Sequence, residues 1–214
     1  MTRAMATVAI FDYGAGNLHS LAKAVAAPGF DIAIVSDAVV AVDSHAYDCL
    51  VLPGVGAFAA AAERIAPARK VLRAAIDDGF PLIGICLGMQ LLFDSSEEGT
   101  GRGLGIIPGR VRRLRASRVP QIGWNTIEES AGSDDATLAI AYYANSFVCE
   151  PRDERWVTAW SSYESDRFPA AVRAGPLGNV VGVQFHPEKS SSNGVSYLRR
   201  LLVRAMQRDA EASR

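Results

Sequence analysis

Four short apolar runs in the first 90 residues constrain the fold more than any other feature of the sequence. They read VAIF, FDIAIV, CLVL and PLIGI, and they begin at Val8, Phe30, Cys49 and Pro81. Nearly continuous apolar runs of this length are typical of strands buried on both faces, which occur in parallel sheets covered by helices. The runs therefore predict an α/β fold with a mostly parallel central sheet.

The segments between these runs carry apolar residues at helical spacing. The first predicted helix begins after Asn17, a favourable capping residue, and ends before Gly29. The helical sequence after Phe58 is interrupted by Pro67 and stops at Gly79. A last amphipathic helix is expected over residues 195–205.

Past Gly101 the pattern changes to β-rich segments joined by short turns. These segments predict antiparallel strands that continue the sheet, namely residues 105–114, 138–148, 156–160 and 179–185. No linker composition divides the chain of 214 residues. A single domain over residues 1–214 is therefore expected, with flexible ends at 1–6 and 207–214.

Charge and cysteine content exclude several functional classes. The 22 basic and 23 acidic side chains create no overall field for nucleic acid or anionic lipid. Three cysteines provide neither an even disulfide set nor a paired C-x-x-C zinc motif, which favours a reducing compartment. The first apolar run is too short for a signal peptide or a membrane span. We therefore expect a cytoplasmic protein with no nucleic-acid or membrane partner.

The fourth apolar run ends in Gly-Ile-Cys-Leu-Gly, residues 84–88, and a helical stretch follows as far as Phe93. This G-x-C-x-G pattern is the thiol form of a nucleophile elbow, a sharp strand-to-helix turn that projects Cys86 and requires flanking glycines. The N-terminus of the helix would favour the thiolate. A buried core thiol is the competing interpretation, and it suits Cys49 and Cys149, which lack the glycines.

A cysteine nucleophile needs a base, and the chain has three histidines. His19 lies in the first predicted helix and His45 in a polar loop, where solvated side chains are expected. His186 ends the apolar run VVGVQF and opens His-Pro-Glu, so Glu188 can accept the imidazole N–H and set its tautomer. An exposed turn is the competing interpretation of this tripeptide alone. Together with Cys86, it predicts a Cys-His-Glu triad.

The third apolar run continues into a glycine-rich loop, LPGVGAF, at residues 52–58. The backbone N–H groups of Gly54, Val55 and Gly56, with that of Leu87 beside the nucleophile, can stabilise a developing oxyanion. A phosphate-binding loop is the alternative. The loop lacks both the Lys-Ser/Thr of a P-loop and a complete G-x-G-x-x-G motif, so the oxyanion role is favoured.

These motifs, in this order, resemble those of the class I (triad) glutamine amidotransferases. The matching stretches are PGVGAF, GICLGMQ and QFHPEKSS, and the resemblance extends from residue 12 to about residue 194. Further features resemble the branch of glutaminase subunits of imidazole glycerol phosphate synthase, in histidine biosynthesis: DYGAGNLHS, Met89, QIGWN and YYANSF. The resemblance implies a three-layer, flavodoxin-like α/β fold whose sheet has an antiparallel extension.

The resemblance also implies the chemistry. Cys86 would attack the side-chain carboxamide of glutamine, and His186 would protonate the leaving ammonia. Water would then hydrolyse the thioester to glutamate. Gln90, Ser146 and Phe147 match the family's glutamine-holding positions. No cofactor and no metal ion are implied.

The family passes ammonia through a channel to a (β/α)8 barrel cyclase subunit, so the resemblance implies a heterodimer. The channel keeps ammonia from taking up a proton in water and losing its nucleophilicity. The residues that match the partner-facing elements of the family are Asp12, Tyr13, Asn17, Gln121, Trp124, Asn125, Tyr142 and Lys189. A core position is the competing interpretation of Trp124.

Two positions depart from the family's pattern, because Gln121 and Asn145 stand where histidines are expected. Neither position belongs to the triad, so the departures concern partner signalling and hydrogen bonding near the glutamine pocket. The rival interpretations of the chain are a glutaminase that serves pyridoxal phosphate or anthranilate formation, a catalytically silent docking subunit, and a thiol peptidase or esterase.

Overall fold

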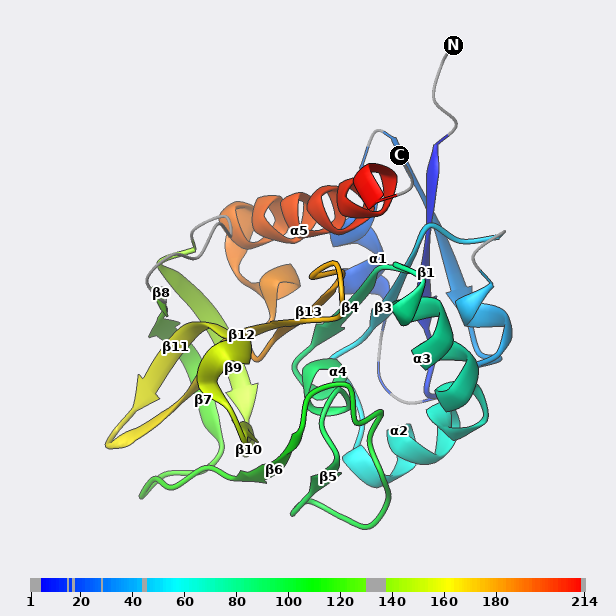
Figure 1. Ribbon diagram of the computed structural model, residues 1–214. Helices are drawn as coiled ribbons and strands as arrows, with labels where there is room; N and C mark the ends of the chain where they lie inside the picture. The colour runs from blue at the N-terminus through cyan, green and yellow to red at the C-terminus, as the bar shows by residue number, and fades with distance from the viewer. Residues whose placement is uncertain are drawn as a thin grey trace.

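The main sheet is mostly parallel, as Figure 1 shows. The computed structural model describes residues 5–14, 16, 18–27, 29–43, 46–129 and 138–212. In spatial order, the strands of the main sheet are β2 (Phe30–Val35), β1 (Ala6–Phe11), β3 (Cys49–Leu52), β4 (Leu82–Ile85), β13 (Val180–Val183), β12 (Asp166–Ala174), β11 (Val157–Tyr163) and β8 (Glu128–Glu129). The strands from β2 to β13 are parallel neighbours, and β12, β11 and β8 extend the sheet antiparallel. The predicted fold class is confirmed.

Both faces of β3, β4, β13 and most of β1 are buried, which explains why their sequences are continuously apolar, whereas the edge strand β2 is only partly buried. Ala9 and Phe11 of β1 belong to the core that packs against α2 (Phe58–Ile65) and α3 (Arg69–Asp77). Val8 and Ile10 belong to the core on the opposite face, which includes side chains of α1 (His19–Val25) and α5 (Ser191–Ala212). Figure 1 shows helices on both sides of the sheet, so the fold has three layers.

Several segments beyond Gly101 differ from the prediction that they continue the sheet as antiparallel strands. Residues 179–185 contain β13, which is parallel to β4 with Val180 opposite Leu82. Residues 105–114 and 138–148 contribute instead to two small sheets, one of β5 (Ser95–Ser96), β6 (Gly109–Arg113) and β10 (Phe147–Pro151), the other of β7 (Gln121–Thr126) and β9 (Ile140–Asn145). A β-rich composition identifies strands, but it specifies neither their neighbours nor their direction.

The helices also differ from the prediction in their limits. The helix after Cys86, α4 (Leu87–Gln90), is shorter than the stretch predicted as far as Phe93. The capping position of α1 is Leu18, without a side-chain capping bond, and Asn17 lies outside the described residues. Short 3₁₀ helices are η1 (Val40–Val42), η2 (Ala66–Ala68), η3 (Glu154–Trp156) and η4 (Pro187–Lys189).

Regular structure extends into the stretches predicted as flexible ends, because β1 begins at Ala6 and α5 continues to Ala212. Residues 1–4 and 213–214 lie outside the described residues. Among the helices of the described ranges, none is both long enough and apolar enough to cross a membrane.

A buried ion pair ties the small sheet of β6 and β10 to the main sheet. The guanidinium of Arg112 on β6 makes two hydrogen bonds of 2.7 Å to the carboxylate of Asp166, the first residue of β12. Arg112 Nε also donates to Glu150 of β10 at 3.1 Å, and both Arg112 and Asp166 are buried. The geometry is bidentate, so the pair fixes both the distance and the orientation of the two sheets.

Replacing one partner of this pair should destabilise the protein strongly. We expect Arg112→Met to lower the free energy of unfolding by about 3–5 kcal/mol, because Asp166 would remain buried without its counter-charge. The double variant Arg112→Met/Asp166→Leu should lose much less, since neither charge remains. Urea unfolding at pH 7 measures both. Equal losses in the single and double variants would contradict the role of the pair.

The pair should also make stability depend on pH. Burial raises the pKa of Asp166, but the Arg112 hydrogen bonds and the Arg115 amide lower it, and on balance the pKa falls below its ordinary value. A carboxyl whose pKa is lower in the folded state stabilises that state above its unfolded pKa, about 3.9. This contribution should disappear as pH falls from about 4 through the folded pKa, and the double variant should lack it.

Candidate active site

Cys86 lies at a strained turn directly after β4. Its φ of 48° falls in the left-handed region, which residues other than glycine rarely adopt. The turn is held by the amide of Cys86, which donates to the Val183 carbonyl at 2.7 Å, and by the amide of Gln90, which donates to the Cys86 carbonyl at 3.1 Å. This geometry agrees with the predicted nucleophile elbow.

The two glycines of the elbow lie where no side chain fits. A β-carbon on Gly84 would lie 2.5 Å from the carbonyl oxygen of Gly88. A β-carbon on Gly88 would overlap the carbonyl oxygen of Leu52, the last residue of β3. The chain can therefore turn sharply at Cys86 only because both positions are glycine.

His186 and Glu188 follow β13, the neighbour of β4. The His186 Nδ1 lies 2.7 Å from Glu188 Oε1, and both side chains are more than 90% buried. The backbone of His186 is held on both sides, because its amide donates to the Tyr142 carbonyl at 2.8 Å and its carbonyl accepts from Ser190 Oγ at 2.7 Å. The carboxylate can therefore orient the ring, as predicted.

Gly54, in the loop after β3, lies against both Cys86 and His186. A β-carbon on Gly54 would lie 2.8 Å from His186 Cε1 and 2.9 Å from the β-carbon of Cys86. The two side chains therefore meet at the carboxyl edge of the sheet, where β3, β4 and β13 end side by side. The sequence prediction that they share one edge is confirmed.

The pKa of His186 reflects this proximity. Burial of the ring lowers the pKa, whereas the charge of the Cys86 thiolate, a hydrogen bond to Cys86 and the carboxylate of Glu188 raise it. The balance lies well above the ordinary value of histidine. The arrangement therefore favours the protonated form of His186, which can give a proton to a leaving group.

The other two histidines provide no second candidate base in the part of the chain that the structure describes. His19 is the first residue of α1 and is exposed, as expected for a solvated side chain. His45 lies outside the described residues. His186 is therefore the histidine that the geometry supports as the partner of Cys86.

The predicted oxyanion loop lies beside this pair. Gly54 and Val55 are half-buried, and Gly56 is exposed with a φ of 105°. A β-carbon on Gly16 would collide with the side chain of Val55, so the loop after β1 packs directly against the oxyanion loop. The amide of Phe58, at the start of α2, donates to Glu98 Oε2 at 3.1 Å. Glu98 was not identified from the sequence.

The residues predicted to hold glutamine surround the carbonyl of Phe147. This oxygen accepts from Gln90 Nε2 at 3.1 Å and from Asn145 Nδ2 at 3.2 Å. The carbonyl of Ser146 accepts from the amide of Leu114 at 2.9 Å. Gln90 is buried, and its helix α4 begins directly after Cys86. The structure thus brings Gln90, Ser146 and Phe147 to one wall beside the nucleophile.

Gln184 is a residue of the site that was not identified from the sequence. This side chain is fully buried, and its Nε2 donates to Cys86 Sγ at 3.5 Å, while its Oε1 accepts from Gln90 Nε2 at 3.5 Å. The available signal was a polar residue near the end of the apolar run VVGVQF, two residues before His186.

The two residues that depart from the family pattern, Gln121 and Asn145, lie opposite each other on neighbouring strands. Gln121 on β7 and Asn145 on β9 are cross-strand partners, and both side chains are at least 95% buried. Each amide has an oxygen, Gln121 Oε1 and Asn145 Oδ1, without a hydrogen-bond partner among the described residues. The two substitutions therefore concern one place in the fold, next to the Phe147 carbonyl.

The predicted partner-facing residues divide between surface and interior. Trp124 is 52% exposed, its ring packs edge-on against Tyr142 at 6.3 Å, and Lys189 is exposed. Tyr13 and Gln121 are buried, because Tyr13 packs on Phe11 and strand alternation turns Gln121 to the opposite face from Trp124. Their contact with a partner stays a prediction.

The remaining predicted partner-facing residues lie at intermediate positions or outside the described chain. Asp12 is half-buried and accepts from the amide of Gly14 at 2.7 Å. Asn125 is half-buried and donates to the Ser162 carbonyl at 3.0 Å. Asn17 lies outside the described residues.

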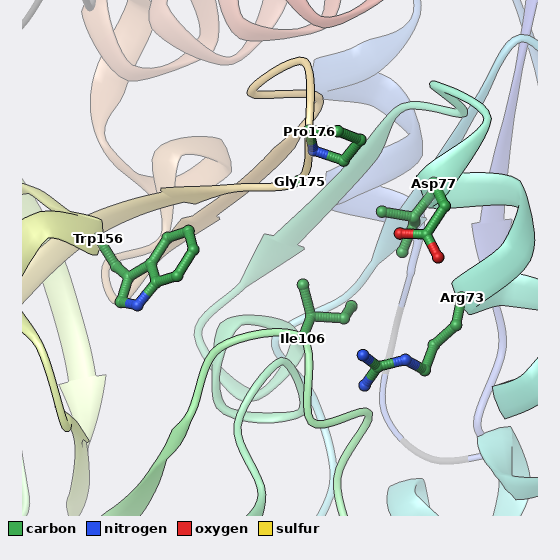
Figure 2. Close-up of a pocket in the computed structure, with 7 residues that line it drawn as sticks. Arg73, Asp77, Ile106, Trp156, Gly175 and Pro176 are labelled. Carbon is green, nitrogen blue, oxygen red and sulfur yellow. The ribbon is translucent and has the colours of Figure 1, made fainter.

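A cavity of about 290 Å³ lies among α3, the segment with Ile106, Trp156 and the turn between β12 and β13. Figure 2 shows its lining, which includes Arg73 and Asp77 of α3, Trp156, and Gly175 and Pro176 of the turn between β12 and β13. Arg73 already donates to the carbonyls of Leu104 and Gly105. The residues that line this cavity are different from those around Cys86.

Comparisons with known proteins agree with this geometry. The glutamine amidotransferase class-I family matches residues 9–205. The imidazole glycerol phosphate synthase subunit HisH of Halobacterium salinarum is 44% identical over 91% of this chain and 91% of its own length. The protein of the same name from Thermus thermophilus is 40% identical over 88% and 93%. The chloroplastic imidazole glycerol phosphate synthase hisHF of Arabidopsis thaliana is 43% identical over 91% of this chain and 34% of its own length.

Solved structures share the fold at low sequence identity. A putative GMP synthase subunit from Thermoplasma acidophilum has a TM-score of 0.71 and 17% identity, with 98% of each chain covered. The glutaminase domain of Trypanosoma brucei CTPS has a TM-score of 0.64 and 16% identity, with 96% and 94% covered. The chain belongs to the class-I glutamine amidotransferases. Within that family, it belongs with the HisH subunits of imidazole glycerol phosphate synthase.

Adding a side chain at Gly54 should damage the site more than the fold. A methyl group there would meet His186, Cys86 and the Ile85 carbonyl within about 3 Å, so the imidazole and thiol would separate. We expect Gly54→Ala to lower glutamate release from glutamine at least about 100-fold, with little change in melting temperature. Gly88→Ala, which collides with the Leu52 backbone, should lower the melting temperature as well. Full activity in Gly54→Ala would contradict this geometry.

Proposed function

We propose that this chain is the glutaminase subunit of an imidazole glycerol phosphate synthase and that Cys86, His186 and Glu188 are its catalytic residues. The observation that carries the proposal is their meeting at one sheet edge, with a 2.7 Å contact between His186 and Glu188 and both Cys86 and His186 beside Gly54. The relatives named HisH supply the subunit role.

The first half of the reaction forms a thioester. The Cys86 thiolate attacks the side-chain carboxamide carbon of glutamine, and the carbonyl oxygen becomes an oxyanion. The amides of the Gly54–Gly56 loop and of Leu87 donate hydrogen bonds to it. The imidazolium of His186 gives its proton to the amide nitrogen, the carbon–nitrogen bond breaks, and ammonia leaves.

The second half releases glutamate. Neutral His186 takes a proton from water, and the resulting hydroxide attacks the thioester carbon. The carbon–sulfur bond then breaks and restores the thiolate beside imidazolium. Glu188 keeps the imidazole in one orientation through both halves. The net reaction converts glutamine and water into glutamate and ammonia.

Removal of the nucleophile should abolish this reaction. We expect Cys86→Ala to reduce glutamate release at least about 1,000-fold when the barrel cyclase subunit is present, because no thioester can form. Cys49→Ala is the matched control, because Cys49 is fully buried in β3 and burial raises the pKa of its thiol. Undiminished turnover in Cys86→Ala would refute the proposed mechanism.

The proposed partner is the (β/α)8 barrel cyclase subunit, docked on the outer face of β7 and β9. This face carries Ile122 at 67%, Trp124 at 52% and Ile140 at 47% exposure. Exposed apolar side chains concentrated on one small sheet are typical of a protein interface. The face adjoins the active site, since the Tyr142 carbonyl on β9 accepts from the His186 amide.

Truncating the exposed indole should weaken the heterodimer. We expect Trp124→Ala to raise the dissociation constant for the barrel subunit at least about 30-fold, the effect of losing a central aromatic contact worth ~2 kcal/mol or more. Ile34→Ala is the matched control, because Ile34 is 56% exposed on β2, at the far end of the main sheet. Calorimetric titration measures both. Equal affinities in the two variants would place the interface elsewhere.

A further inference from the structure

Gln184 is a buried amide for which the triad mechanism has no role. Its side chain is fully buried between the end of β13 and His186. Its main chain is fixed, because its amide donates to the Ala170 carbonyl of β12 at 2.9 Å. A buried amide is costly unless its polar atoms find partners, so the contacts of the Gln184 side chain define what it does.

Those contacts join the nucleophile to the predicted glutamine wall. The Gln184 Nε2 donates to Cys86 Sγ at 3.5 Å, an ordinary length for a hydrogen bond to sulfur, and Oε1 accepts from Gln90 Nε2 at 3.5 Å. Gln90 Nε2 also donates to the Phe147 carbonyl at 3.1 Å. An unbroken chain of hydrogen bonds therefore runs from β10 through two glutamine amides to the sulfur.

The sulfur thus has two neighbours of different chemistry. His186 can hold or release a proton, whereas the Gln184 amide donates at every pH at which the protein is folded. A donor that does not titrate stabilises a thiolate both when the imidazole is charged and when it has lost its proton. The donation by Gln184 is therefore the same whether the imidazole proton has been given to ammonia or regained from water.

We propose that Gln184 is a further residue of the reaction, which stabilises the Cys86 thiolate by a permanent hydrogen bond and aligns it with Gln90. The proposal rests on the proposed role of Cys86 as nucleophile. Gln184 donates to the reacting sulfur itself, and through Gln90 it fixes the distance between the nucleophile and the wall that receives glutamine.

The test is the pH dependence of Cys86 alkylation by iodoacetamide, read by mass spectrometry of the peptide that carries Cys86. The titratable groups that face the sulfur are His186, with Glu188 behind it, and the Cys149 thiol of β10. These groups are unchanged in Gln184→Met, which keeps the length of the side chain and removes the donor. We expect its alkylation midpoint to rise by about one pH unit, equivalent to ~1.4 kcal/mol.

Gln184→Glu should raise the midpoint further, because a carboxylate would face the thiolate. In both variants kcat for glutamate release should fall at least about tenfold, in line with the weaker stabilisation of the thiolate. Gln90→Met should instead raise KM and leave the alkylation midpoint unchanged. Gln184→Asn, which withdraws the donor by one methylene group, replaces Gln184→Met if the latter fails to fold, and it should give the same direction of shift.

Asn179→Ala is the matched control for a merely structural amide. Asn179 is fully buried at the other end of β13, and its Nδ2 donates to the carbonyls of Ile76 and Phe80. This variant should lower the melting temperature and leave the alkylation midpoint in place. An unchanged midpoint in the Gln184 variants would overturn the proposal. Alkylation needs no glutamine, so this result is separate from the Cys86→Ala turnover test of the proposed function.

Discussion

The site depends on the parallel pairing of β3, β4 and β13. Parallel neighbours end at the same edge of a sheet, so the loop with Gly54, the turn with Cys86 and the segment with His186 leave the sheet side by side. Each strand contributes only one part of the chemistry. Ordinary strand pairing therefore assembles side chains that lie far apart in the sequence, and no special long-range contact is needed to explain their meeting.

Close backbone packing adds precision to this arrangement. Gly84 lies against the backbone of Gly88, and Gly88 in turn lies against the carbonyl of Leu52, so the turn at Cys86 packs closely on β3. The left-handed conformation of Cys86 is retained because the structure around it leaves no room for relaxation. The nucleophile is consequently positioned by a rigid part of the sheet and not by the four-residue helix α4 that follows.

Much of the site could be predicted from the sequence, because the relevant signals are local. Glycines around Cys86 and the spacing of His186 and Glu188 are readable without coordinates. Gln184 was missed because its partner sulfur lies 98 positions away along the chain. The burial of Gln121 could not be predicted, since the register of β7 against β9 is set by pairing and not by composition. The parallel direction of β13 was missed for the same reason.

Tyr142 connects the exposed apolar face of β7 and β9 to the site around Cys86. Its ring touches Trp124 on the exposed apolar face, while its peptide carbonyl accepts from the His186 amide and its own amide donates to Ser190 Oγ. A single residue thus contacts both the exposed apolar face and the backbone of the proposed catalytic histidine. A molecule that docks on this face and shifts the backbone of Tyr142 would therefore shift the backbone of His186 directly, through a single hydrogen bond.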